Sequence, residues 1–433
     1  MSISKVALGA GVILLALIAA GANFIIPNSN YSVLMAMPKA PPLSAKIPGD
    51  VSATANTTDI DTFSWESFVA VNWPADGIGV IGAKGDNVAA WQFWKQDTDV
   101  LVPAGQTPIA WKTASPIPAI CTQPAPPGTR ILTHSTKRGE LGNFKTPGNG
   151  PLIDQNGNYV RFEILLNEPM YDFILQNNLY STFGQTNYNP GGVVAFPSGV
   201  QNGAVGAVML KIAWKIMGVG DDPTKFHTSL AYIFDPGATP KCDLKQVGLV
   251  GMHISHKTTN APQWVWSTFE HVDNAPVSGN TLNPHYNFND GKAANNPPNC
   301  GASGGTCNLV PSGTWDPNTG VKTPVQLVRL SDVTPTAKIE NANFIAALKA
   351  VNAKSVFANY HLIGTQFPTD ITSTGDPSGV PRPLFLANST METFLQGKAP
   401  RVSSDCAGCH VLATMSDQRT SDFSYILARV GMH

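Results

Sequence analysis

The five residues from Cys406 to His410, Cys-Ala-Gly-Cys-His, carry the most specific chemical signal in this 433-residue chain. Two thiols three positions apart lie on one turn of a helix, where each can add to a vinyl group of haem. The adjacent His410 can then supply a ring nitrogen to the iron. The motif therefore predicts one covalent haem c, held by Cys406 and Cys409, with His410 as the proximal iron ligand.

A disulfide or half of a zinc site is the competing interpretation of the same two cysteines. A tetrahedral zinc site needs four ligands, and the chain has no second C-x-x-C and no H-x-x-x-H pair to complete one. We therefore favour haem. In this segment the chain resembles the c-type cytochromes, and that resemblance implies that the haem is attached outside the cytoplasm.

The N-terminal segment predicts export. An apolar run from Val6 to Ile26 follows Lys5, and small residues at positions 20–22 match the A-x-A cleavage site of a secretory signal. The run is also long enough to span a bilayer if it is not cleaved. We expect a periplasmic or extracellular protein, and the sequence leaves open whether residues 6–26 are removed or anchor it to the inner membrane.

Low charge is the main compositional feature. Charged residues make up 13% of the chain, about half the usual fraction, and the formal net charge is −1. No basic patch favours nucleic acid or an acidic membrane surface, so any membrane contact is expected only at the N-terminal segment. The expected partner is a redox protein or a small-molecule electron donor.

Four further cysteines lie outside the haem motif. In an oxidising compartment an even number of them predicts disulfides. Cys300 and Cys307 flank a short glycine-rich turn and are expected to pair with each other, which leaves Cys121 to pair with Cys242. Sequence alone leaves all three connectivities open, and four unpaired thiols are a further alternative.

The hydrophobic pattern predicts a mainly β fold with peripheral helices, an α+β class with a large antiparallel body. In residues 205–217, apolar residues alternate with polar or small ones, which is the period of a half-buried antiparallel strand. Such runs are typical of a meander or a sandwich. Further strands are expected at residues 159–166, 226–234, 246–256, 262–272 and 356–367, and helices at residues 61–72, 168–179 and 341–351.

These patterns divide the chain into four segments: a signal peptide or anchor (1–26), a Pro- and Ser-rich tether (27–58), the β-rich body (59–388) and a helical haem-attachment segment (389–433). Three helices are expected in the last segment. The first begins with a capping box between Ser389 and Glu392, the second carries the haem motif, and the third begins near Ser421.

Candidate ligands for the other side of the iron concentrate in residues 251–274. His253, His256 and His271 lie there beside two acidic residues, which is dense for a chain so poor in charge. On a regular strand His253 and His256 point to opposite faces, so at most one of them meets the haem. Each histidine could instead be a hydrogen-bonded core or surface residue.

Other residues near these candidates have two interpretations. His361 and Met432 are further possible ligands, whereas Met415 is too close to the motif to reach the opposite haem face. Trp264 and Trp266 are expected to share one face of a strand, either as core or as the lining of the haem pocket. Residues 154–158 resemble a calcium loop, but the Gly and Glu that such a loop needs are misplaced, which favours a polar turn.

Two functions fit these features. The first is electron transfer by a haem with both axial positions filled, and the second is a haem enzyme or gas binder with one position open. A β-rich chain that ends in C-x-x-C-H and an aromatic segment, DFSYIL, is similar to the cytochrome c-prime-beta group and its hydroxylamine-oxidising relatives. That resemblance implies five-coordinate iron, a carboxylate proton acceptor such as Glu270 or Asp273, and a haem-linked lysine, for which Lys257 is the candidate. A binding module that uses haem as a reporter is a third possibility.

Overall fold

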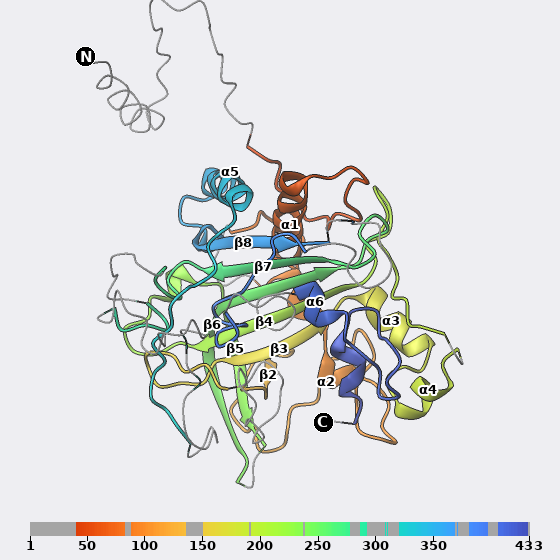
Figure 1. Cartoon of the computed structure of the whole chain (residues 1–433). Coiled ribbons are helices and arrows are strands. Elements are labelled where there is room, and N and C mark those ends of the chain that lie inside the picture. Colours follow the sequence, from red (N-terminus) through yellow and green to blue (C-terminus); the bar gives the residue numbers. More distant parts are fainter. Residues whose placement is uncertain are drawn as a thin grey trace, which may run out of the picture. The chain divides into compact units, whose positions relative to one another are not determined.

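An eight-stranded β-sheet forms the centre of the fold (Figure 1). In the computed structural model its strands are β1 (Lys95–Gln96), β2 (Arg130–Leu132), β3 (Arg161–Leu166), β4 (Val208–Ile216), β5 (Thr228–Asp235), β6 (Lys241–His256), β7 (Val265–His271) and β8 (Tyr360–Gln366). The structure describes residues 40–82, 88–135, 150–189, 192–236, 239–277, 286–291, 308, 310, 320–368, 370, 381–396 and 406–431.

Strand β6 is the longest strand and joins the two parts of the sheet. β4 pairs with one edge of β6, while β5 and then β7 pair with successive halves of its other edge, and β8 lies beyond β7. Among the named strands only β2 and β5 pair in parallel. The prediction of a mainly β, α+β fold is confirmed. The sandwich alternative is wrong, because these eight strands belong to one mixed sheet.

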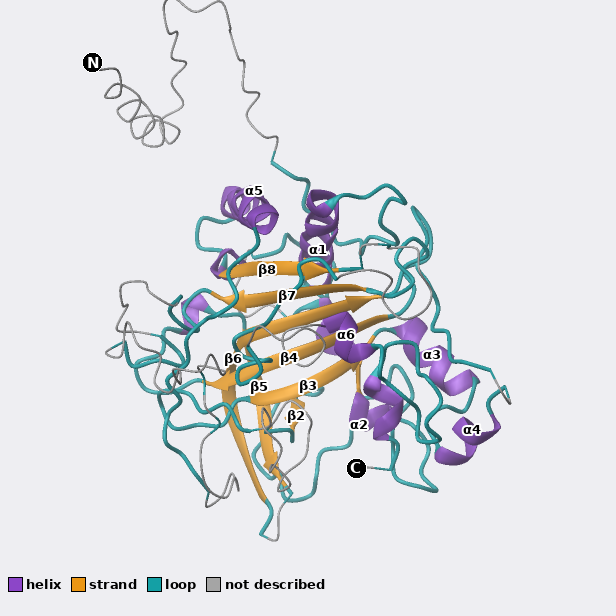
Figure 2. Ribbon diagram, viewed as in Figure 1, coloured by secondary structure: helices purple, strands orange, loops and turns teal. Residues whose placement is uncertain are grey.

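The α-helices lie around this sheet (Figure 2). Those in the described residues are α1 (Thr57–Val71), α2 (Asp97–Val100), α3 (Glu168–Gln176), α4 (Thr182–Asn187), α5 (Pro335–Val351) and α6 (Cys406–His410). Short 3-10 helices span Ala90–Phe93, Pro223–Lys225, Val356–Asn359 and Tyr425–Arg429. Both α1 and α5 begin upstream of the predicted starts because side chains cap them there: Asn56 accepts from two amides of α1, and Thr334 caps α5.

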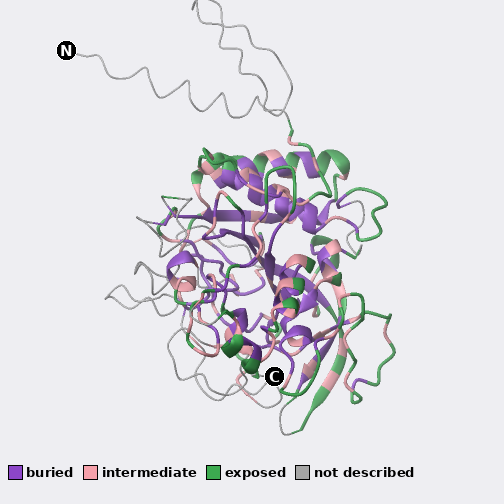
Figure 3. Cartoon of the chain, turned by 90° about the vertical axis from the view of Figure 1, so that its right-hand side faces the viewer, coloured by how far each residue is buried: buried purple, intermediate pink, exposed green. Residues whose placement is uncertain are grey.

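Helices α1 and α5 cover one face of the sheet, which we call the α1 face. The Trp65 ring of α1 stacks on the Phe344 ring of α5 with centroids 5.3 Å apart. Both rings belong to the largest apolar core, together with Leu210, Ile254 and Phe269 of the sheet. Figure 3 shows that the central strands are buried, and the first half of β6, beside β5, is largely exposed.

The opposite face, which we call the α6 face, carries two separate apolar clusters. One gathers around Trp266 and includes Met209, Ala407 and Phe423. The other includes Ala213. The strand register places a more polar row, Lys211, His253 and Thr268, between them. The α6 face is therefore the side of the sheet on which polar side chains and the haem motif come near each other.

The haem-attachment segment differs from its predicted three helices. Among the described residues of this segment, α6 is the one α-helix. Residues 389–396 form turns, and the last described element is a 3-10 helix at Tyr425–Arg429. The capping box between Ser389 and Glu392 is wrong. Ser389 donates its hydroxyl to Glu270, and Glu392 instead accepts from the backbone amide of Asn388 at 2.9 Å.

Part of the expected tether is attached to the body. The Asp50 carboxylate accepts from the Asn260 amide at 3.1 Å, and Val51 is buried in a small apolar cluster. Residues 1–39, which include the predicted signal or anchor, lie outside the described residues. Within the described part of the chain, none of the helices has the length and apolarity to cross a bilayer.

The disulfide predicted between Cys121 and Cys242 is confirmed. Their Cα atoms are 5.1 Å apart, and the bond joins the loop before β2 to the beginning of β6 across 121 residues of sequence. The second predicted pair, Cys300 with Cys307, lies outside the described residues. A crosslink across so long a loop restricts the unfolded chain strongly.

Replacement of Cys121 and Cys242 together by Ser should lower the free energy of unfolding by about 2–5 kcal/mol, because the unfolded chain regains the entropy of an open loop. Denaturant unfolding of the double variant and the wild type, both under oxidising conditions, measures this difference. An unchanged unfolding midpoint with an unchanged slope would contradict a stabilising role for this bond.

Candidate haem-binding site

The predicted helical turn of the motif is present as α6, and the sheet holds its beginning. The Ala407 amide donates to Oε1 of Gln366 at 3.0 Å, which ties α6 to the last residue of β8. Ala407 is fully buried in the cluster around Trp266, whereas Cys406 and Cys409 are partly exposed. The two thiols therefore lie at the border between the apolar cluster and solvent.

The His410 ring has a fixed orientation and a defined proton position. Its Nδ1 lies 2.7 Å from the carbonyl oxygen of Phe423. A carbonyl oxygen can only accept, so Nδ1 carries the proton and the lone pair of the neutral ring is on Nε2. The Trp266 ring lies 4.4 Å from the His410 ring and the Tyr425 ring 5.3 Å from it, centroid to centroid. The hydrogen bond selects the tautomer that a metal-ligating histidine commonly uses, and the two ring contacts restrict the orientation of the imidazole.

Trp266 combines the two roles that the sequence left open. It is buried in the apolar cluster and it also contacts the imidazole of His410. Trp264 lies outside the strand, because β7 begins at Val265 and the φ of Trp264 is +68°. The two indole rings are still neighbours, with centroids 6.2 Å apart.

Among the three predicted distal histidines, His253 alone lies on the α6 face. Ser255 of β6 pairs with Trp266, and His253 is two residues before it, so the two side chains share a face. The side chain of His253 is 16% exposed, and its Nε2 is 3.2 Å from a carboxylate oxygen of Glu392. The His253 imidazole therefore contacts the Glu392 carboxylate on the α6 face, in the row of residues next to that of Trp266.

His256 and His271 belong to the α1 face. Nε2 of His256 donates to the Val205 carbonyl at 2.6 Å, and its ring lies 5.1 Å from Phe63 of α1. His271 shares its face with the core residue Phe269 and stacks on Phe226 at 4.1 Å. Burial lowers the pKa of His256 and of His271 to about 4. The structure therefore separates these two side chains from the side of the sheet where α6 lies.

The other suggested iron ligands are further from the motif or outside the structure. His361 of β8 pairs with Glu270, at the opposite end of the β7–β8 ladder from Gln366. Its pKa is lowered by burial and by the charge of Arg329. Met432 lies outside the described residues.

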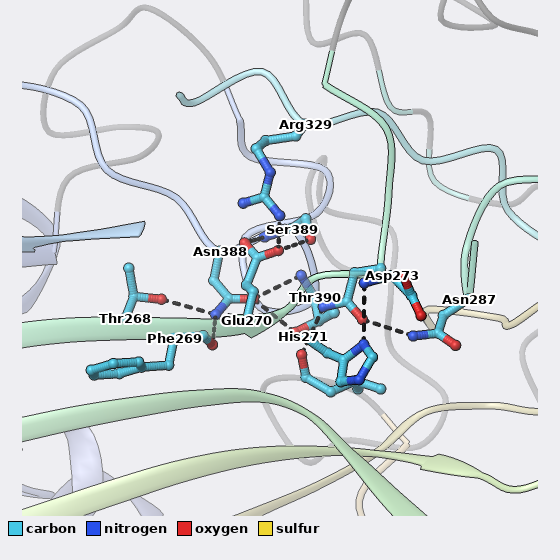
Figure 4. A network of polar contacts seen from close by, with 12 residues as sticks. Thr268, Phe269, Glu270, His271, Asp273, Asn287, Arg329, Asn388, Ser389 and Thr390 are labelled. Carbon is cyan, nitrogen blue, oxygen red and sulfur yellow. Dashed lines mark hydrogen bonds and ion pairs between the residues drawn. The ribbon is translucent and has the colours of Figure 1, made fainter. Parts of the chain in front are cut away.

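The carboxylate of Glu270 anchors a turn to the sheet (Figure 4). It is buried and accepts from the guanidinium of Arg329, from the Ser389 amide at 2.5 Å and from the Ser389 hydroxyl. The neighbouring Asn388 donates to Thr268 and to the Phe269 carbonyl. With both oxygens engaged by these donors, Glu270 has the surroundings of a structural residue.

Asp273, the other suggested proton acceptor, lies just beyond β7. Its carboxylate pairs with Lys225 at 3.1 Å, and Lys225 is half exposed. Its backbone amide donates to Nδ1 of His271 at 3.1 Å. These contacts place Asp273 with the His271 group and away from α6.

Glu392, which the sequence suggested as part of a helix cap, is the acidic residue that contacts His253. Its position after Ser389 suggested a helix cap, but the chain forms a turn there, and the turn brings the carboxylate to His253. Lys211 lies opposite His253 in the ladder of β4 and β6. Neither neighbour has a local sequence signal, because both depend on strand register and on a long-range turn.

The suggested calcium loop is a polar turn. One oxygen of Asp154 accepts from the amides of Asn156 and Asn158, and Gly157 donates its amide to the Asp154 carbonyl. Burial raises the pKa of Asp154 to about 6. Within the described residues no group of three or more His, Cys, Asp or Glu side chains is arranged to hold a metal ion.

The geometry of α6 fits haem c in its donor set. The motif supplies two partly exposed thiols on one turn and an imidazole with its proton fixed on Nδ1. Comparison with known proteins adds no family to this geometry, since no family model, no curated protein and no solved structure matches the chain.

Acid should destabilise the fold through the buried histidines. The pKa of His256 is about 4 in the folded chain and 6.5 in the unfolded one, so between these values the unfolded chain binds more protons. The free energy of unfolding should then fall as the pH drops from 6.5 to 4, by up to about 1.4 kcal/mol per pH unit for this group. Denaturant unfolding across that range measures the slope.

A His256→Gln variant is the matched comparison, because it lacks the titrating ring at the same buried position. Its stability should decline less steeply than that of the wild type over the same pH range. Equal slopes for the two proteins would show that His256 does not remain neutral in the folded state.

Proposed function

We propose that this chain is an exported c-type cytochrome that binds one haem covalently through Cys406 and Cys409 and transfers electrons. The hydrogen bond from His410 Nδ1 to Phe423 is the observation that carries the proposal, because it prepares Nε2 as a ligand and fixes the ring. The Cys121–Cys242 disulfide agrees with an oxidising compartment.

Each residue of the motif has a defined role in this proposal. The two thiols would hold the cofactor and His410 would ligate its iron, and the bound haem would supply a ferric–ferrous couple. Trp266 and Ala407 are buried and would exclude water on the side of the motif that faces the sheet. On the outer side Tyr425 is 41% exposed and donates its hydroxyl to the Cys409 carbonyl at 2.8 Å. This partly exposed side suits electron exchange with a protein or a small donor.

We propose that His253 would supply the second nitrogen to the iron of a bound haem, since it is the predicted distal histidine that lies on the α6 face. Its pairing with Glu392 also favours the second candidate function, a haem enzyme with an open iron position. In that case the imidazole–carboxylate pair would accept a proton from a substrate. The two functions therefore use the same residue, once as a ligand and once as a base.

Replacement of Cys406 and Cys409 together by Ala should abolish covalent attachment, because neither thioether can then form. Acid–acetone extraction of the purified variant should remove all haem, while the wild type should retain it. A double variant that kept haem through the extraction would contradict attachment at this motif.

Absorption spectra of the wild type with and without carbon monoxide should show low-spin bands that the gas leaves unchanged, because His253 would supply a second nitrogen to the iron of the bound haem. A His253→Ala variant should become high-spin and sensitive to carbon monoxide. His256→Ala is the matched control on the same strand, and it should keep the low-spin spectrum because its side chain faces α1. A wild type that is already high-spin would favour the enzyme, and two unchanged variants would exclude His253 as the ligand.

A further inference from the structure

The turn that carries the Phe423 carbonyl has an unusual backbone. Asp422 and Phe423 have φ angles of +52° and +60°, and both are non-glycine residues in the left-handed region. Side chains other than glycine adopt this region at a cost, and consecutive cases are rare. Such backbone persists where the surroundings determine it, and it concentrates at functional sites.

A buried ion pair holds this turn. Lys257 Nζ contacts both carboxylate oxygens of Asp422 at 2.5 Å, and each of the two side chains is 8% exposed. The Phe196 amide also donates to the Asp422 carboxylate, at 2.7 Å. Lys257 follows the last residue of β6, and its own amide donates to the Ala207 carbonyl. The sheet therefore fixes the position of Lys257, and the ammonium group of Lys257 holds the turn at Asp422.

This turn also contacts the chain that follows α6. Ser421 donates its amide to the Ala413 carbonyl at 3.0 Å and its hydroxyl to the Ser424 carbonyl at 2.6 Å. The Phe423 side chain is buried in the cluster that contains Ala407. Between these two attachments the Phe423 carbonyl oxygen meets Nδ1 of His410.

We infer that Lys257 and Asp422 are positioning residues for His410. Their ion pair holds the left-handed turn in the place where the Phe423 carbonyl accepts the Nδ1 proton. A strong hydrogen bond at Nδ1 increases the basicity of the other ring nitrogen, and a more basic axial ligand favours the ferric state. Through His410 the pair would thereby influence the reduction potential of the bound haem. This inference rests on the proposed function.

Two variants and their combination test it in the full chain with haem attached. Asp422→Asn keeps the side-chain shape, tolerates the left-handed backbone and removes the charge, and Lys257→Met removes the cation. The combination of both avoids leaving a single charge buried without its partner. Lys257→Arg retains the charge as a rescue. Lys225→Met is the control, because it breaks the partly exposed pair with Asp273 away from α6.

The positioning role predicts complete covalent haem in every variant. Reduction should become more favourable by about tenfold in Asp422→Asn, in Lys257→Met and in the combined variant, which corresponds to a potential about 59 mV more positive for a one-electron couple. In the same three proteins the Nδ1 proton of His410 should exchange faster with solvent by NMR. Lys257→Arg and Lys225→Met should keep both wild-type values.

A folded combined variant with full haem, the wild-type potential and the wild-type proton exchange would overturn the inference. That result would leave the proposed function intact, because haem would still be attached. A wild-type chain without covalent haem would instead refute the proposed function. The two failures are therefore distinguishable in one set of proteins.

Discussion

The hydrogen bond from His410 to the Phe423 carbonyl is the interaction on which the site depends. It joins the one-turn helix of the motif to a strained turn that is anchored by Asp422 and Lys257 to the end of the sheet. The described part of α6, Cys406–His410, is short, and the orientation of the His410 ring depends on the contacts of its side chain with Phe423, Trp266 and Tyr425. The large β body therefore supplies the residues that fix the orientation of the His410 ring.

The sheet also sorts the polar residues around that ring. Strand alternation sends His256 to the α1 face, where it is buried and neutral, and His253 to the α6 face, where it meets Glu392. Glu270, which the sequence suggested as a base, holds the turn from which Glu392 projects. Glu270 therefore stabilises the turn, and Glu392 is the carboxylate that contacts His253.

Local patterns in the sequence were sufficient for strands β3 to β8, for the mainly β class and for α6. They missed β1 and β2, which have only two and three residues. The Cys121–Cys242 pair was expected, but the sequence left the connectivity open and the structure decided it. The opposite orientation of His253 and His256 also followed from alternation alone. The pairing of Glu392 with His253 did not, because it depends on a turn that replaced an expected helix. The turn at Asp422 carries no glycine signal, so only the structure reveals its left-handed backbone. Long-range packing decides both features, and neither leaves a periodic trace in the chain.

The central claim is that the thiols of Cys406 and Cys409 carry haem. Mass spectrometry of the proteolytic peptide that spans α6, from protein exported by a host with haem-attachment machinery, tests it most directly. Covalent attachment predicts a peptide that bears the mass of one haem and has no thiol left to alkylate. A peptide with an internal disulfide, or with two thiols that react with an alkylating reagent, would contradict it.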